Sequence, residues 1–297
     1  MLGILGLLAA FVGSIAEAGF RVVNQQYKID PPVLAIYRGL GVALILLPFL
    51  IFIPYPTSPL FYLLVGINGC IASISSRRSM DLINHHGANI ASKLLTVPPV
   101  LVAILWWVLQ PAKFATFVDK EPYQAVAAIF CLIGMIFTIF ALGHNKNTHK
   151  AVVAGIPIFI CYVIQTFLCF GALKEVSLLQ GMFYYVCLQG IIIGTINYFI
   201  HVHHLKGHLK EDLLLTIFDK RTLKAGLLFI TAMIIARFLV NISFKLLPNP
   251  SWVVLICNLQ IIWIYLASKK LHVKNVISPT KGIILAIYAI TFIILTY

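Results

Sequence analysis

The residues in this sequence best able to do chemistry are ionisable side chains inside apolar runs: Glu17, Arg21, Arg38, Lys93 and Arg237. A charge at membrane depth costs roughly 2.5–3.5 kcal/mol on insertion scales, so each one needs a partner or a function. Four are basic and one is acidic, and guanidinium groups bind carboxylate and phosphate oxygens in pairs. The excess of positive charge therefore predicts a site for an anion, although lipid headgroups could absorb the same charge.

Glu17 and Arg21 are four residues apart, so on a helix they share a face and can pair. They are either a neutralised structural pair or groups that face a central cavity. We predict that Arg21 and Arg237 bind the anionic part of a solute, while Glu17 orients Arg21 or exchanges a proton. Arg38 could contribute to the same site or extend to the membrane interface.

Amide side chains within the apolar runs complete the predicted site. The predicted substrate-binding set is Glu17, Arg21, Arg38, Lys93, Gln165, Arg237, Asn241 and Asn258. Further polar residues could line the same path or form interhelical hydrogen bonds: Asn24, Gln25, Asn68, Ser73, Ser75, Gln189, Asn197 and Gln260.

The sequence contains no Walker motif, HExxH motif, nucleophile elbow or acidic cluster. His201, His204 and His208 would share a helical face, but no Cys or carboxylate completes a metal site, and Gly207 interrupts the helix. The six cysteines all lie in apolar runs without a CxxC pair and are interpreted as small buried hydrophobic residues. We therefore expect no metal, no cofactor and no enzymatic activity.

The composition is that of an integral membrane protein. Of 297 residues, 61% are hydrophobic and 10% are charged, whereas soluble domains contain about 25% charged residues. The net charge of +13 would suggest nucleic acid in a soluble protein. Here the basic residues lie mostly at helix ends, which is typical of membrane topology and predicts no nucleic-acid partner.

Apolar runs of spanning length, separated by Pro, Gly, Asn and charged residues, predict an all-α polytopic protein with ten transmembrane helices. The predicted ranges are 2–25, 32–53, 59–77, 87–110, 123–143, 151–173, 178–200, 223–245, 251–268 and 277–296.

The ten predicted helices divide into two halves near Thr148. Residues 1–148 form the predicted first repeat of five helices, and residues 149–297 form the second. An odd number of spans in each half inserts the second copy upside down relative to the first. The stretch from Ser79 to Gln110 and the stretch from Ser243 to Ser268 share their order of features: basic residues, a polar break, a spanning helix and an aromatic end. An inverted repeat places its site at the membrane midplane between the halves.

Orientation is predicted from charge. Connections after odd-numbered helices hold fourteen Lys and Arg residues, and those after even-numbered helices hold four. The positive-inside rule then places the odd connections in the cytoplasm and both termini on the other side.

The chain resembles the drug/metabolite transporter (DMT) superfamily, in its ten-helix EamA-like group. The resemblance lies in the helix count, in Arg38 within YRGLGVALILLPF, in LLTVPPVLVAILWWVL and in FLVNISFKLLPNPSWVVLICNLQ. Family members commonly carry an acidic-basic pair after the fourth helix, where this chain has Gln110-Pro111-Ala112-Lys113. The family usually has both termini in the cytoplasm, opposite to the orientation predicted here from charge.

The resemblance implies a secondary transporter of the cell (inner) membrane that moves a small polar solute by alternating access. The buried positive charge narrows this to an anionic or zwitterionic metabolite. The alternatives are a lipid-phosphate flippase, an amine or drug exporter that uses Glu17, and a membrane-embedded transferase that would need the histidines from His201 to His208 or the cluster Asp81, His85 and His86. Expected partners are a small-molecule substrate and membrane lipids, with the protein a monomer or homodimer.

Overall fold

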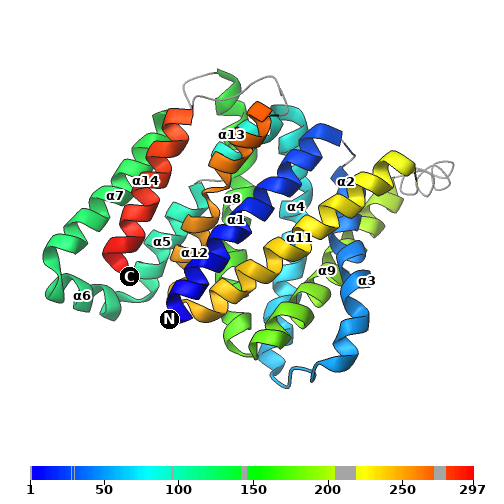
Figure 1. Cartoon of the computed structure of the whole chain (residues 1–297), viewed down its shortest axis with the longest axis horizontal. Coiled ribbons are helices and arrows are strands. Elements are labelled where there is room, and N and C mark those ends of the chain that lie inside the picture. The colour runs from blue at the N-terminus through cyan, green and yellow to red at the C-terminus, as the bar shows by residue number, and fades with distance from the viewer. Residues whose placement is uncertain are drawn as a thin grey trace.

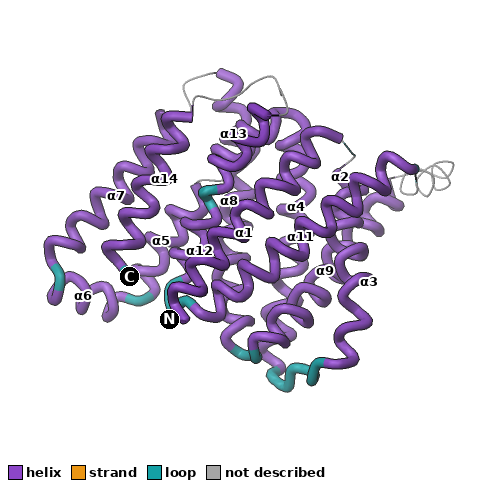
Figure 2. Tube along the Cα trace, viewed as in Figure 1, coloured by secondary structure: helices purple, strands orange, loops and turns teal. Residues whose placement is uncertain are grey.

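A computed structural model describes residues 2–27, 29, 31–94, 97–141, 146–204, 219–270 and 279–297, and these residues form helices and short connections without a strand (Figure 2). The long helices are α1 (Leu2–Tyr27), α4 (Pro59–Leu94), α7 (Pro122–Ala141), α8 (Lys146–Lys174), α9 (Leu178–His204), α11 (Lys220–Leu246) and α14 (Pro279–Thr296).

The prediction of a polytopic helical membrane protein is confirmed. The described ranges contain eight helices long and apolar enough to cross a membrane, or nine if one bent pair of helices counts as a span. This is fewer than the ten spans predicted from sequence. One difference is at the C-terminal end, where the apolar part of α14, Gly282–Thr296, is shorter than a standard span.

The predicted second helix is one span with three changes of helical type. It begins as α2 (Pro31–Ile36), widens into the π-helical turn η1 (Tyr37–Gly41), continues as α3 (Val42–Leu46) and ends as the 3-10 helix η2 (Leu47–Phe52). Single π turns inside α-helices occur often at functional sites. In this chain the π turn contains Arg38.

Two predicted spans are broken. The predicted helix 87–110 is divided between the end of α4 and a separate helix α5 (Val97–Leu109), whose first turn contains Pro98 and Pro99. Proline lacks an N–H and suits a first helical turn, where that N–H has no partner, so the pair starts a helix here. The predicted helix 251–268 is divided into α12 (Pro250–Cys257) and α13 (Gln260–Lys270).

The predicted connection between Pro111 and Pro122 also differs, because it contains the helix α6 (Pro111–Lys120), bent by 91° from α5. It crosses the lower edge of the bundle (Figure 1). The ring of Trp107 lies 4.9 Å from that of Phe114 and 6.2 Å from that of Phe117. Tryptophan favours the membrane–water interface, so Trp107 suits a position where a helix lies across the end of the bundle.

The helices pack in pairs that are distant in sequence. α1 runs along α11 and α4 along α8, while α7 packs against α14 at one side of the bundle (Figure 1). The helix α5 meets α12. The two ends of the chain lie together, because Gly3 of α1 is in contact with the hydroxyl of Tyr297.

A backbone contact holds the π turn against α9. A Cβ atom added to Gly39 would collide with the backbone N and Cα of Gly194 and would lie 2.6 Å from the carbonyl oxygen of Gly190. Only glycine permits two helices to approach so closely. The three glycines therefore fix the position of η1, and with it the position of Arg38.

Two lysines join the C-terminal ends of α8 and α11. The Lys245 Nζ donates to the carbonyl oxygens of Val176 at 2.6 Å, Leu173 at 3.1 Å and Lys174 at 3.5 Å. In return, the Lys174 Nζ donates to the carbonyl oxygens of Lys245 at 3.0 Å and Leu247 at 3.3 Å. The last carbonyls of a helix have no intrahelical partner and carry partial negative charge, so each ammonium group stabilises the end of the other helix.

We expect Lys245→Met to lower the free energy of unfolding by about 2 kcal/mol, because three hydrogen bonds from a charged donor are lost and part of that loss is restored by water. The measurement is the unfolding midpoint of the purified protein in detergent. Lys120→Met on exposed α6 is the control, with an expected change within about 0.5 kcal/mol. Equal midpoints for the two variants would show that the lysine contacts do not stabilise the bundle.

Candidate functional site

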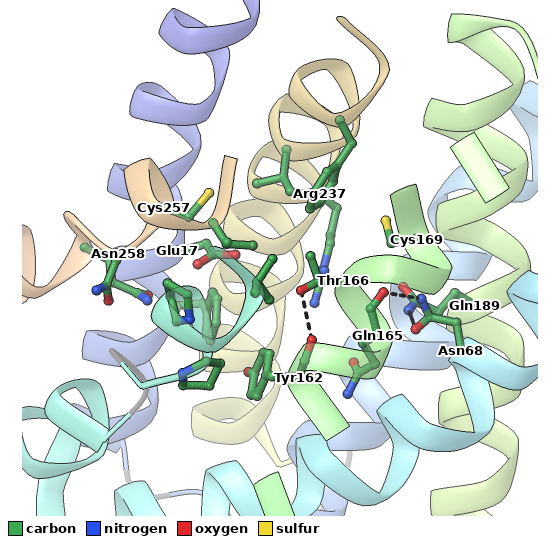
Figure 3. A pocket seen from close by; sticks show the side chains of 18 of the residues that line it. Glu17, Asn68, Tyr162, Gln165, Thr166, Cys169, Gln189, Arg237, Cys257 and Asn258 are labelled. Atoms are coloured by element: carbon green, nitrogen blue, oxygen red, sulfur yellow. Dashed lines mark hydrogen bonds between the residues drawn. The ribbon is translucent and has the colours of Figure 1, made fainter. Parts of the chain in front are cut away.

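A cavity lies inside the bundle, lined by residues of α1, η1, α4, α5, α8, α9, α11, α12 and α13 (Figure 3). The space between its walls, including the solvent at its open mouth, is about 860 Å³. Its lining is Glu17, Phe20, Arg21, Arg38, Asn68, Pro98, Pro99, Val102, Tyr162, Gln165, Thr166, Cys169, Tyr185, Gln189, Arg237, Val240, Phe244, Val254, Cys257, Asn258 and Gln260.

The cavity lies deep in the region that would be inside a membrane. Asn68, Gln165 and Gln189 line it, and each is near the middle of its own spanning segment. The two broken spans also reach it, through Pro98 and Pro99 at the start of α5 and through Asn258 at the end of α12. Broken helices at a midplane cavity are a recurrent feature of solute sites in membrane proteins.

Four charged side chains from three spans line the cavity. Arg21 is 3% exposed and Arg38 is 7% exposed, whereas Glu17 and Arg237 are half-buried. Figure 3 shows the Arg237 side chain extending from α11 into the cavity toward Thr166, with Glu17 on the other side. Arg38 lies within electrostatic range of Arg237, Glu17 and Arg21.

None of these four charged groups has a polar partner in the described part of the chain. The structure contains no hydrogen bond or ion pair from Glu17, Arg21, Arg38 or Arg237 to another described residue, and Nε and Nη1 of Arg21 are buried without an acceptor. The Arg21 guanidinium lies over the ring of Phe20, with Cζ 5.4 Å from its centroid. An unpaired charge away from water costs several kcal/mol, so a bound anion would stabilise this arrangement.

The opposite wall is a neutral hydrogen-bonded network. The Asn68 Nδ2 donates to the Tyr185 hydroxyl at 2.8 Å and to the Gln165 carbonyl oxygen at 3.0 Å. The Gln189 Nε2 donates to the Asn68 Oδ1 at 3.0 Å, and the Gln165 Nε2 donates to the Ser75 Oγ at 2.7 Å. These bonds connect α4, α8 and α9, and they leave this wall polar but uncharged (Figure 3).

The break between α12 and α13 presents two more amides. Asn258 and Gln260 are buried, and their side-chain oxygens Oδ1 and Oε1 have no hydrogen-bond donor. Buried amides are normally satisfied, so unsatisfied ones beside a cavity require an explanation such as a bound group.

The structure brings six of the eight sequence-predicted site residues to one cavity: Glu17, Arg21, Arg38, Gln165, Arg237 and Asn258. Asn241 is outside the lining; its Nδ2 donates to the Gly181 carbonyl oxygen at 3.1 Å and links α11 to α9. The side chain of Lys93 lies outside the described residues. Glu17 and Arg21 share a helix but form no ion pair, so the predicted structural pair is not present.

The metal site considered for His201, His204 and His208 falls largely outside the described residues. Among the residues that are described, no group of three His, Cys, Asp or Glu side chains could hold a metal ion.

Sequence reasoning did not select Tyr162, Thr166 or Tyr185, although all three line the cavity. A hydroxyl or an aromatic ring in an apolar run has no special spacing, and such residues occur as often in packing as in sites. Only the packing of α8 and α9 against α4 shows which of them face the cavity.

Comparisons with known proteins define the fold only. No protein-family model matches the chain, and no curated protein matches it. A solved structure titled "Crystal structure of protein" is similar, with a TM-score of 0.62, 13% sequence identity, and coverage of 98% of this chain and 94% of that one. At this identity the similarity shows that the two chains share a helical fold over nearly their full lengths.

Proposed function

We propose that the protein is a secondary transporter that moves a small polar, anionic or zwitterionic metabolite by alternating access. The observation that carries this proposal is the cavity at mid-membrane depth whose arginines have no partner in the described part of the chain. Charged groups without protein partners suit a carrier, because a solute of opposite charge can supply the missing partner.

The packing supports an inverted repeat of five plus five helices. If the chain is divided near Thr148, the first helix of each half is α1 or α8, and the third is α4 or α11. Replacing each helix by its counterpart in the other half therefore turns the α1–α11 pair into the α8–α4 pair, and both pairs are in extensive contact. Three further contacting pairs each join a helix to its own counterpart, so the replacement leaves them unchanged: α7–α14, η1–α9 and α5–α12. A twofold relation between two similar halves produces this pattern of contacts.

The proximity of the chain ends supports an even number of crossings, as ten helices require. Gly3 and Tyr297 are in contact, so both ends lie at the same side of the bundle. We place that side outside the cytoplasm, since the connections at the other side hold most of the basic residues. Membership of the drug/metabolite transporter superfamily and a location in the cell inner membrane are part of this proposal.

The test is ligand-dependent thermal stabilisation of the purified protein, with anionic, zwitterionic and cationic metabolites. A ligand at a hundred times its Kd stabilises the native state by about 2.7 kcal/mol. In Arg237→Gln, the loss of a charged hydrogen-bond donor is expected to weaken anion binding by roughly 10- to 150-fold. The control is Arg78→Gln, which removes an exposed arginine outside this cavity.

Transport itself is tested by uptake into proteoliposomes of whichever solute stabilises the protein. Uptake that is lost in Arg237→Gln and kept in Arg78→Gln supports the proposal. Stabilisation by cations alone would make Glu17 the primary ligand and indicate an amine exporter. Binding without uptake of any soluble ligand, combined with movement of a labelled phospholipid between leaflets, would indicate a flippase.

A further inference from the structure

The cavity charge limits the class of solute more narrowly than the proposed function does. With all four groups ionised, three guanidinium groups and one carboxylate leave two net positive charges on the lining. In the described ranges none of the four forms a hydrogen bond or an ion pair with a protein partner. A bound anion would therefore be the main source of compensating charge inside the bundle.

Solutes of different charge leave different residual charge in the cavity. A zwitterion adds no net charge and leaves both positive charges, and a monoanion leaves one. A dianion leaves none. Residual charge in a partly buried site costs free energy that water would otherwise remove, so the neutral complex is the most favourable of the three.

The geometry of the arginines also favours a dianion. They come from three separate elements, with Arg21 on α1, Arg38 on η1 and Arg237 on α11, and all three line the same cavity. Each planar guanidinium can form paired hydrogen bonds with two oxygens. Carboxylate and phosphate groups offer such oxygens on several sides at once, whereas the neutral network around Gln165 can contact uncharged hydroxyls of the same solute.

We propose that the preferred solute is a compact dianion, such as a phosphate monoester or a short dicarboxylate, held by Arg21, Arg38 and Arg237. This inference rests on the transport function proposed above and specifies its solute class. The shared chemistry is two negative charges carried by oxygen atoms of one small molecule.

The sharpest test compares two ligands of the same shape and different charge. Methyl phosphate is mostly a dianion at pH 7.5 and a monoanion at pH 5.0, because its second pKa is about 6. Methyl sulfate is a monoanion at both pH values. The experiment is a thermal-shift titration of the full chain at constant ionic strength. The ratio of methyl phosphate affinity to methyl sulfate affinity is expected to be at least ten at pH 7.5 and to fall toward one at pH 5.0.

Further ligands identify the source of the dianion. Succinate against succinamate repeats the comparison for carboxylates. Dihexanoyl phosphatidic acid against methyl phosphate separates a lipid headgroup from a free phosphate ester. Alanine is the zwitterion of comparable size.

Two variants move the charge of the lining in opposite directions. Arg38→Gln lowers it by one, and the ratio of methyl phosphate to methyl sulfate affinity is expected to fall several-fold. Glu17→Gln raises it by one, and the affinity for both anions is expected to rise. Arg78→Gln on the exposed face of α4 is expected to leave the ratio unchanged. A purely structural role of Arg38 would lower both affinities together without changing their ratio.

The outcomes are distinguishable from those of the transport test. Preference for methyl sulfate or alanine, with uptake of that solute, would overturn the dianion inference and leave the transport proposal standing. Preference for methyl phosphate or succinate that follows the ionisation state supports the inference. The absence of stabilisation by any of these ligands would overturn the dianion inference, whereas the transport proposal would be decided by the wider set of metabolites and the uptake test described above.

Discussion

Replacing Arg21 by methionine is expected to make the ligand-free protein more stable and to weaken its binding of anions. Arg21 is 3% exposed, and its Nε and Nη1 have no acceptor. Methionine fills a similar volume without a charge, so the free energy of unfolding should rise by about 1–3 kcal/mol. The same substitution removes a charged donor from the cavity, so anion affinity should fall roughly 10- to 150-fold.

The opposite signs of these two effects distinguish a binding residue from a structural one. A structural arginine stabilises the fold, and its removal lowers the unfolding midpoint. A binding arginine is held in an unfavourable state that only its ligand relieves, which is the usual conflict between stability and function. Arg21 is predicted to behave in the second way because its Nε and Nη1 are buried without an acceptor and its guanidinium lies over the ring of Phe20.

The measurement is the unfolding midpoint of wild type and Arg21→Met, each with and without a saturating anion. Arg21→Lys is the matched control, since it keeps the charge and loses the planar guanidinium. Without ligand, Arg21→Lys should have a midpoint close to that of wild type. Its anion affinity should lie between those of wild type and Arg21→Met. A lower midpoint for Arg21→Met with an unchanged response to the anion would show that Arg21 is structural.

The second large effect is expected at the crossing of η1 and α9. Gly39→Ala places a Cβ atom against the backbone of Gly194. Ordinary overpacking costs about 1–3 kcal/mol because side chains can move aside. The atoms in contact here are backbone atoms of a transmembrane helix, so η1 itself must shift. We expect a loss larger than that range, together with loss of anion binding through displacement of Arg38.

Gly66→Ala on α4 is the matched control, because nothing lies within 4 Å of an added Cβ there. In a helix interior this change is expected to be neutral or to stabilise by up to about 1 kcal/mol. Both variants should be compared by size-exclusion profile and unfolding midpoint. Similar midpoints for Gly39→Ala and Gly66→Ala would mean that the two helices separate readily and that the crossing does not position Arg38.

The sequence was sufficient for the spans that have continuous apolar runs. The predicted ranges 123–143, 178–200 and 223–245 agree closely with α7, α9 and α11, because spanning length and the flanking polar residues define a membrane helix locally. It was less informative where proline occurs inside an apolar run. The predicted span 87–110 includes Pro98 and Pro99, but in the structure they start a new helix, since a proline can either kink a helix or begin one.

The sequence by itself also determined which side chains had to be explained. A charge in an apolar run is costly wherever the fold places it, so Glu17, Arg21, Arg38 and Arg237 could be selected without a structure. Gln165 and Asn258 can be selected for the same reason, although burying a neutral amide costs less free energy than burying a charge. Asn241 satisfied the same criterion but links two helices through the Gly181 carbonyl oxygen, because an amide serves equally well in packing and in a site.

Only the tertiary structure decided which of these groups meet. The glycine contact between η1 and α9 places Arg38, and the packing of α1 along α11 brings Arg21 and Arg237 to the same cavity. Tyr185 joins them through its bond with Asn68, a residue 117 positions earlier. The length of an apolar run determines whether a segment can span the membrane, and that length depends only on residues adjacent in the sequence. Convergence of side chains depends on contacts between segments far apart in the chain, and no local pattern specifies those contacts.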